Sequence, residues 1–272
     1  MKFLSRLRLL RPAPVGQIDL GVPPPAEAPF CVIGDPHGRH DLLMKMLEKL
    51  ARRPDAAALR VICAGDMVDR GPESAAVLRH LKGLGDNPAP FAQVLCLRGN
   101  HEEMLLNFLG NPERHGPRWL TVGGAETLMS FDLSPYRMGG GGTETNTAPL
   151  VALRDRFAKT LGADLHRWLK ELPLMWREGK WAVTHAGADP RKPLDTQTDA
   201  ALVWGHGKFY RQARQDGIWV AHGHRIMPDA TIAEGRVAVD TGAYRSNRLS
   251  AAVMTSAGVE LLQVSPADQN DV

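Results

Sequence analysis

The stretch PFCVIGDPHG, residues 29–38, decides the fold, because an apolar strand-like run is followed at once by an aspartate and a histidine. The pattern recurs where Gly65-Asp66 follows RVICA and where Gly99-Asn100 follows VLCLR. Asp35, Asp66 and Asn100 are 31 and 34 positions apart, and one strand–helix–strand unit takes about 30 residues. Each interval is therefore one step across a parallel sheet, which gathers the three side chains at the edge where open α/β sheets bind ligands.

Strand-like and helical patterns alternate through the first part of the chain, which predicts an α/β fold built from parallel βαβ units. Later strands come in pairs joined by Glu234-Gly235 and Ala257-Gly258, which predicts antiparallel hairpins. The helices are expected at 39–52, 74–83, 102–110 and 149–172. The strands are expected at 30–34, 60–65, 91–98, 181–187, 218–224, 230–234, 236–240, 249–255 and 259–264.

The domain organisation follows from the proline-rich start of the chain and from a long middle segment without strands. Residues 1–29 are predicted to be a loosely ordered leader and extended linker. One domain is expected over 30–264, with a helical cap insertion at about 104–172 and a flexible loop around Gly139–Gly142. Residues 265–272 form a tail.

Composition excludes several classes of protein. The net charge is +3, from 33 basic and 30 acidic residues, which is too balanced for a partner that is a nucleic acid polymer. No segment is apolar over the ~20 residues of a membrane span, so no membrane partner is expected. Three cysteines without a CxxC pair predict buried free thiols in a reducing cytoplasm. Nothing in the sequence indicates the oligomeric state.

The strand ends predict a metal centre made of carboxylate, amide and imidazole groups. Two later strands end in VTHAG and VAHGH, which add His185 and His224. Such a set without thiolate suits Mn or Fe, with Zn and Mg as alternatives, and six ligands suit two divalent ions that share Asp66 and activate a bridging water. The candidate ligands are Asp35, His37, Asp66, Asn100, His185 and His224.

Residues suited to phosphate chemistry lie beside these ligands. Arg70, in DMVDRG, can form a forked contact with phosphate oxygens. His101 follows Asn100 and can protonate a leaving oxygen, with Asp69 holding its other ring nitrogen. These three residues are therefore the candidate catalytic groups.

The ordered motifs GDPHG, GDMVDRG, GNHEE, HAG and HGH resemble the calcineurin-like metallophosphoesterase superfamily, in its phosphoprotein phosphatase branch. The segments WLTVGGAETL and DTGAYRSNRLSA extend the likeness, which covers about residues 30–264. Within the branch the chain is similar to small bacterial and phage serine/threonine protein phosphatases and to symmetrical diadenosine tetraphosphatases.

The resemblance implies a central β-sandwich flanked by helices in αββα layers and a Mn-preferring two-metal centre. It implies one metal on Asp35, His37 and Asp66. It implies the other metal on Asp66, Asn100, His185 and His224, with His224 favoured over His222. His101 becomes the general acid with Asp69 behind it, and Arg70 and Asn100 contact phosphate.

One motif departs from the family pattern. Relatives often carry WxR as a second phosphate clamp, whereas this chain has WGHGK at 204–208, with His206 in place of the arginine. Lys208, Arg211 or Arg225 are candidates to supply the charge, and Tyr244 is expected to line the site.

The leading interpretation is thus a metal-dependent phosphoric ester hydrolase acting on phosphoserine or phosphothreonine proteins. A bis(5′-nucleosyl)-tetraphosphatase or another nucleotide phosphohydrolase is the alternative. A regulatory module that binds phosphorylated ligands without turnover is a weaker alternative, supported only by the incomplete WxR clamp. A dinucleotide-binding oxidoreductase is disfavoured because no GxGxxG opens the first helix.

Overall fold

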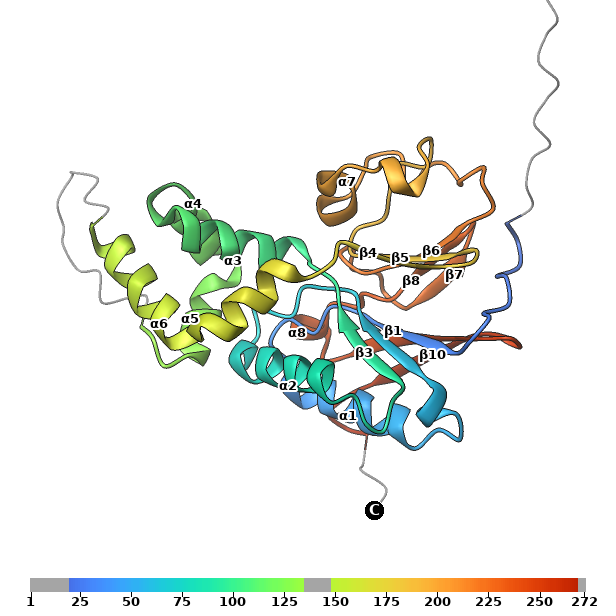
Figure 1. Ribbon diagram of the computed structural model, residues 1–272, viewed down its shortest axis with the longest axis horizontal. Coiled ribbons are helices and arrows are strands. Elements are labelled where there is room, and N and C mark those ends of the chain that lie inside the picture. Colours follow the sequence, from blue (N-terminus) through green and yellow to red (C-terminus); the bar gives the residue numbers. More distant parts are fainter. Residues whose placement is uncertain (1–19, 135–147, 269–272) are drawn as a thin grey trace, which may run out of the picture.

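The computed structural model describes residues 20–134 and 148–268 (Figure 1). The loop expected around Gly139–Gly142, most of the leader and the last residues of the tail lie outside the described residues. The described part of the linker runs along the first sheet, where the backbone N–H of Ala26 donates to the carbonyl oxygen of Thr255 at 3.1 Å.

The first sheet contains the strands that the opening motif predicts. Its order is β10-β9-β1-β2-β3, and β1, β2 and β3 run parallel, whereas β9 is antiparallel to both β1 and β10. The parallel units and the hairpin at Ala257-Gly258 are therefore confirmed. The strands are β1 (Phe30–Ile33), β2 (Arg60–Cys63), β3 (Gln93–Cys96), β9 (Leu249–Thr255) and β10 (Gly258–Val264).

The second sheet has the order β4-β5-β6-β8-β7. The β7–β8 hairpin around Glu234-Gly235 is confirmed, but β5, β6 and β8 run parallel, which the sequence pattern did not predict. The sequence pattern did not predict β4. The strands are β4 (Met175–Glu178), β5 (Trp181–Thr184), β6 (Trp219–His222), β7 (Thr231–Ala233) and β8 (Arg236–Ala238).

The two sheets stack face to face, and β1 shows how its side chains alternate between two apolar layers. Phe30 and Val32 point into the core between the sheets, where Trp181 and Trp219 join them from the second sheet. Cys31 and Ile33 point to the opposite face, into the core beneath the helices. All four residues of β1 are buried, so the strand reads as a continuous apolar run rather than an alternating one.

Helices cover both outer faces of the sandwich, which confirms the αββα layers (Figure 1). α1 (His40–Ala51) and α2 (Ser74–Asp86) cover the first sheet, and α7 (Asp199–Trp204) covers the second. α8 (Ala243–Ser246) lies after β8, and two short 3₁₀ turns, η1 (Ala56–Ala58) and η3 (Leu194–Thr196), complete the layers. Among the described residues, no helix combines the length and the apolar character that crossing a bilayer requires.

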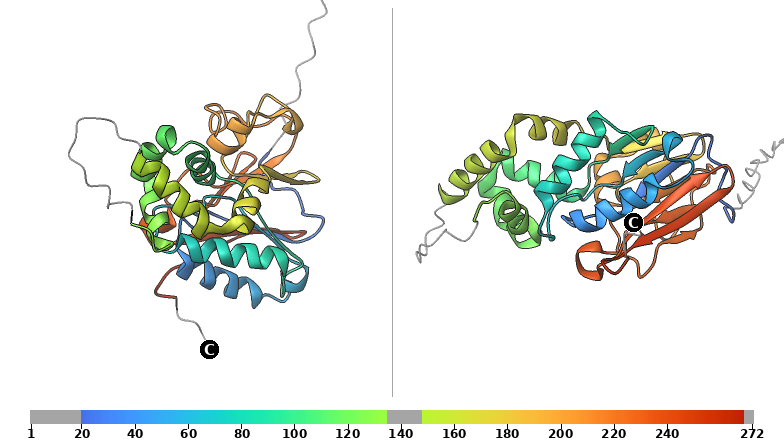
Figure 2. Two further views of the ribbon diagram at one scale, coloured as in Figure 1. Left: turned by 60° about the vertical axis from the view of Figure 1, so that its left-hand side comes forward. Right: turned by 90° about the horizontal axis from the view of Figure 1, so that it is seen from below.

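The insertion after β3 is mainly helical in its described part and gathers at one end of the sandwich (Figures 1 and 2). η2 is a π turn that contains a break at Gly123. α3, α4 and α6 contact one another, and α5 contacts α2. The elements are α3 (Asn100–Gly110), α4 (Pro112–Trp119), η2 (Leu120–Gly124), α5 (Ala125–Ser130) and α6 (Ala148–Glu171).

Candidate metal centre and active site

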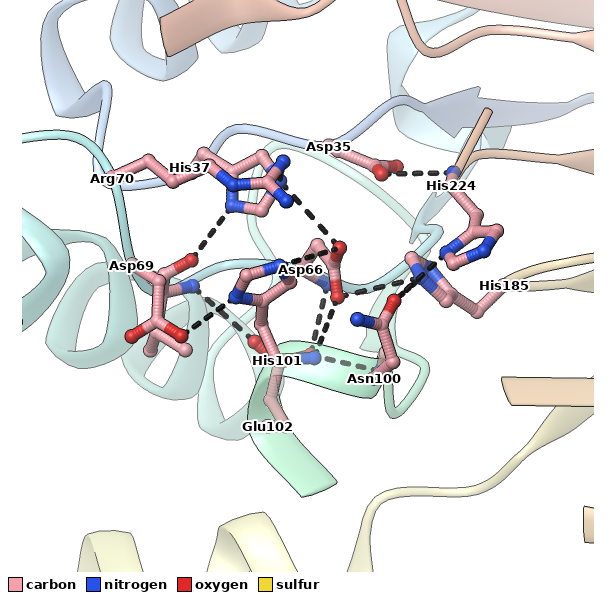
Figure 3. Close-up of polar contacts among 12 residues, drawn as sticks. Asp35, His37, Asp66, Asp69, Arg70, Asn100, His101, Glu102, His185 and His224 are labelled. Atoms are coloured by element: carbon pink, nitrogen blue, oxygen red, sulfur yellow. Dashed lines mark hydrogen bonds and ion pairs between the residues drawn. The ribbon is translucent and has the colours of Figure 1, made fainter. Parts of the chain in front are cut away.

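The fold gathers the polar residues that end separate strands into one cluster (Figure 3). The first sheet supplies Asp35 after β1, Asp66 after β2 and Asn100 at the start of α3. The second sheet supplies His185 after β5 and His224 after β6. The cluster therefore spans the edge shared by both sheets, which is the edge predicted from the strand spacing.

Asp66 lies at the centre of the cluster and is only 2% exposed. Its Oδ1 is 3.3 Å from His185 Nε2 and accepts the backbone N–H of His101 at 3.0 Å. Its Oδ2 is 3.5 Å from His37 Nε2. Burial opposes ionisation of the carboxyl, but the imidazoles of His185, His101 and His37 outweigh burial and hold the pKa of Asp66 well below its usual range.

Imidazole nitrogens and oxygen acceptors converge around Asp66 and Asn100. His185 donates Nδ1–H to the carbonyl oxygen of Ala64 at 3.0 Å, so the Nε2 of a neutral ring presents a lone pair. That Nε2 lies 2.9 Å from Asn100 Oδ1, which is also 2.8 Å from His224 Nδ1. His37 likewise donates Nδ1–H, to Val68 O at 2.8 Å. With neutral rings, nitrogen lone pairs that face acceptor oxygens suit a cation between them, although Arg70 Nη1 already lies 2.9 Å from His37 Nε2.

One carboxylate oxygen of Asp35 is buried without a polar partner among the described residues. Its Oδ2 accepts the backbone N–H of His224 at 2.8 Å, but its buried Oδ1 has no hydrogen-bond partner among the described residues. Burial, followed by the charges of Asp240 and Asp66, raises the pKa of the Asp35 carboxyl well above its usual range. An orphaned carboxylate oxygen among imidazole and amide ligands fits a divalent cation.

Within the described part of the chain, two groups of three residues have ligand atoms within 4.8 Å of one another, and both include Asp66. One is Asp66, His185 and His224, which are three of the four residues that the resemblance implies for the second metal. The other is His37, Asp66 and His101, whereas Asp35, expected with His37 and Asp66, turns its carboxylate toward His224. His222 lies outside both groups, and its Nδ1 is 2.9 Å from the carbonyl oxygen of Gly223.

His101 and Asp69 form a buried pair beside the cluster. His101 Nδ1 donates to Asp69 Oδ2 at 2.6 Å, and its Nε2 lies 4.0 Å from Asp66 Oδ2. Burial would lower the pKa of His101, but the Asp66 and Asp69 carboxylates outweigh burial and raise it. The other nitrogen therefore faces the candidate metal ligands while Asp69 fixes the ring, as in an acid–base catalytic pair.

Several of these residues have left-handed backbone conformations that side chains rarely adopt. The φ angles are 51° at Asp66, 73° at Asp69, 69° at Arg70 and 65° at His224. Each such conformation costs on the order of 1 kcal/mol or more and persists only where the surroundings impose it. The strain is concentrated in the turns that aim these side chains.

Glu102, which the sequence interpretation left without a role, imposes one of these turns. Its carboxylate is fully buried and accepts backbone N–H groups of Asp66 at 2.8 Å, Met67 at 2.7 Å and Gly99 at 2.8 Å. Burial raises the pKa of Glu102 to about 7. Its place in GNHEE was the available signal, but the partners lie up to 36 positions away in sequence.

A cavity of about 490 Å³ opens beside the cluster. Of the residues predicted to contact phosphate, Arg70, His206, Arg225 and Tyr244 line it, whereas Asn100 is not among its described lining residues. The Arg70 guanidinium lies 4.8 Å from the Tyr244 ring centroid, and the Arg225 guanidinium lies 4.3 Å from that of Tyr210. Trp204 and Tyr210, to which the sequence interpretation gave no role at the site, add aromatic walls. The described lining residues are Arg70, Ala186, Trp204, Gly205, His206, Gly207, Tyr210, His224, Arg225, Ile226 and Tyr244.

The structure separates the candidates for the second phosphate clamp. His206 lines the cavity, although its Nε2 lies 3.7 Å from the Asp189 carboxylate. Arg225 lines it as well, whereas Lys208 and Arg211 are not among its described lining residues. Arg225 is thus the cation best placed to join Arg70 around an anion.

Two stacked sheets between helical layers, with metal-ligand groups at the strand ends, are the architecture of metallophosphoesterases. The family model described as calcineurin-like phosphoesterase matches residues 28–228, and the chain belongs to this family.

Curated relatives include the symmetrical bis(5′-nucleosyl)-tetraphosphatases of Escherichia coli O1:K1 / APEC and Salmonella arizonae, 29% and 28% identical over 172 residues. Each match covers 62% of this chain and 47% of the relative, so the chain spans about half the length of the curated relatives it matches.

Solved structures show the same fold at low identity. A putative diadenosine tetraphosphatase is 19% identical with a TM-score of 0.60, covering 91% of this chain and 98% of that one. A protein serine/threonine phosphatase from Saccharomyces cerevisiae is 16% identical with a TM-score of 0.54, covering 90% and 82%. A cold-active protein-tyrosine phosphatase of a Shewanella species is 17% identical with a TM-score of 0.54, covering 90% and 84%.

Proposed function

We propose that this chain is a dinuclear-metal-dependent phosphatase that hydrolyses phosphate esters or anhydrides with water. The observation that carries the proposal is the convergence of acceptor atoms around Asp66, with Asp35 Oδ1 left unpartnered and Arg70 and His101 alongside. A site of this composition holds cations and binds anions, which is what transfer of a phosphoryl group to water requires.

Six residues would hold the two ions, with Mn favoured over Fe, Zn and Mg for this oxygen- and nitrogen-based set. When bound, such ions lower the pKa of water and neutralise charge on phosphoryl oxygens. The one shared ligand is Asp66. The full set is Asp35, His37, Asp66, Asn100, His185 and His224.

The other residues bind the phosphoryl group and move a proton. Arg70 and Arg225 hold its oxygens from the cavity side, with His206 and Tyr244 beside them. The Asn100 side-chain NH₂ group is left to donate to a phosphate oxygen, since its Oδ1 faces the histidines. His101 donates a proton from Nε2 to the leaving oxygen while its Nδ1–H stays on Asp69.

Two substrate classes follow from different observations. The aromatic walls of the cavity, Trp204, Tyr210 and Tyr244, suit a nucleotide base, and the curated relatives are named bis(5′-nucleosyl)-tetraphosphatases. The structural likeness to a protein serine/threonine phosphatase keeps phosphoserine and phosphothreonine proteins as the second candidate. We place the dinucleoside polyphosphate first, because the cavity offers rings and cations together.

A metal-by-substrate panel on the purified protein tests the proposal. The substrates are diadenosine tetraphosphate, a phosphoserine peptide and p-nitrophenyl phosphate, each with Mn, Fe, Zn or Mg. Asp66→Asn is expected to lower turnover of every substrate at least about 100-fold, because both ions lose a shared ligand. Exposed Asp195→Asn is the matched control and should be neutral.

Full activity of Asp66→Asn would refute the shared-metal mechanism. A metal-loaded wild-type protein that binds phosphate but turns over none of the substrates would instead favour the regulatory module.

A further inference from the structure

The cap insertion reaches the Asp69–His101 pair directly. Trp119, the last residue of α4, donates its indole N–H to Asp69 Oδ2 at 3.0 Å and lies 3.2 Å from Oδ1. Thr127, in α5, donates its hydroxyl to Asp69 Oδ1 at 2.7 Å and accepts the Asp69 backbone N–H at 2.9 Å. All of these side chains are buried, so water does not compete for the contacts.

The chain needs a break in its helix to make both contacts. Residues eight apart in an α-helix are separated by about 12 Å along the axis, too far for one carboxylate. The π turn η2 and Gly123, at φ 125°, interrupt the helix between Trp119 and Thr127. A Cβ at Gly123 would lie 2.6 Å from the Arg70 backbone nitrogen, so the break also packs against the catalytic loop.

Both oxygens of Asp69 are therefore engaged. Oδ2 accepts from His101 Nδ1 and from Trp119, and Oδ1 accepts from Thr127. A carboxylate held at both oxygens cannot rotate without losing buried hydrogen bonds, each of which is costly to leave unmade. Its orientation fixes the ring plane of His101 and keeps the proton on Nδ1.

We propose that Trp119 and Thr127 of the cap are positioning residues for the general acid: they lock the Asp69 carboxylate and thereby aim His101 at the leaving oxygen. The inference rests on the proposed phosphatase function. It assigns the cap a role in catalysis and explains why the break at Gly123 lies against the Asp69–Arg70 turn.

A purely structural role would have a different signature. Trp119 also stacks on Phe108, with ring centroids 4.6 Å apart, and the Thr127 hydroxyl lies 3.1 Å from Ser74 Oγ. Loss of packing alone would lower stability and would slow every substrate alike. Loss of acid alignment slows mainly the substrates whose leaving group needs a proton.

The test compares phenyl phosphate, whose leaving group is a poor one, with 2,4-dinitrophenyl phosphate, whose leaving group departs without protonation. For Thr127→Val and Trp119→Phe, with Mn present, kcat/KM on phenyl phosphate should fall about 10- to 100-fold, which is part of the roughly 10²–10⁴-fold that general acid catalysis contributes. On dinitrophenyl phosphate the fall should stay below about threefold. Thr127→Ser, which keeps the hydroxyl, should restore most of the lost rate.

The chain offers matched controls within the same insertion. Thr121 is exposed, and its hydroxyl donates to Arg118 O at 2.8 Å, so Thr121→Val removes a hydroxyl that does not touch Asp69. Trp168, half-buried on α6, provides Trp168→Phe. Neither variant should lower kcat/KM on phenyl phosphate more than on dinitrophenyl phosphate.

Equal losses on both substrates, or no loss on either, would overturn the inference, as would the same split in Thr121→Val. If Thr127→Val does not fold, Trp119→Phe, which keeps an aromatic ring in the core, provides the test. A wild-type protein inactive toward both esters and toward every substrate of the metal-by-substrate panel would overturn the proposed function and the inference with it.

Discussion

At the scale of single residues, Gly223 shows how tightly the candidate metal centre is built. A Cβ at this position would lie 1.9 Å from Asp35 Oδ1, the buried oxygen without a partner. Gly223→Ala must therefore push the carboxylate away from the cluster. We expect the affinity for Mn, measured by isothermal titration calorimetry, to fall about 10- to 100-fold, as for other changes that misplace a ligand.

The matched control is Gly83→Ala, because nothing lies within 4 Å of a Cβ at that helical position. It should leave Mn affinity unchanged and stabilise the fold by about 0.5–1 kcal/mol. If Gly223→Ala binds Mn with the affinity of the wild type, Asp35 is not a ligand in the candidate metal centre.

Arg225 carries the second residue-scale prediction. Its guanidinium lies over the Tyr210 ring, and both Arg225 and Arg70 line the cavity. Arg225→Met keeps the apolar stem and removes the charge. KM should rise about 10-fold or more, in line with the 1.5–3 kcal/mol of a hydrogen bond to a charged group. Steady-state kinetics of Arg211→Met, an exposed position outside the cavity lining, should match the wild type. A larger rise in KM for Arg211→Met than for Arg225→Met would show that Arg211, and not Arg225, is the second phosphate-binding cation.

The sequence identifies some site residues and not others for a physical reason. Asp35, Asp66 and Asn100 end consecutive strands, so their spacing alone places them at one edge. Trp119 and Thr127 read as ordinary core and helix residues, because their partner, Asp69, lies 50 and 58 positions away. Only the folded insertion brings them together.

At the scale of elements, the strong apolar strands were predictable and the weak ones were not. β1, β5 and β6 are buried along their whole length and appear as continuous apolar runs. β4 (MWRE) is a half-exposed edge strand, so its sequence lacks the signal. The parallel pairing of β6 with β8 was hidden because the hairpin strand β7, and no helix, connects them.

Three neighbouring strands carry the cysteines and give a prediction at this scale. Cys31, Cys63 and Cys96 lie in β1, β2 and β3, all buried, and Cys63 faces Cys96 in register. Burial raises the pKa of the Cys31 thiol, and the contact with Cys63 followed by burial raises that of Cys96. The native protein should not react with 5,5′-dithiobis(2-nitrobenzoic acid) at about pH 8, since reaction needs an accessible thiolate.

Unfolding in guanidinium should release all three thiols to the reagent. A thiol that reacts within seconds in the native protein would show that the sheet beneath the candidate metal ligands is open to solvent.

At the scale of the whole molecule, the site exists only when three parts assemble. The first sheet supplies Asp35 and Asp66, the second supplies His185 and His224, and the insertion supplies the contacts to Asp69. The α/β class followed from alternating patterns, but the stacking of the two sheets was expected only from the family resemblance. The reason is that the core between the sheets joins residues such as Phe30 and Trp181, which are distant in sequence.

The central claim is that this assembly holds two divalent ions. Crystals grown or soaked with Mn, measured at the manganese absorption edge, test it most directly. The account predicts two anomalous peaks about 3.5–4 Å apart, one on either side of the Asp66 carboxylate, with His37 at one and Asn100, His185 and His224 at the other. A difference map without a peak beside Asp66, or with a single ion that Asp66 does not contact, would contradict it.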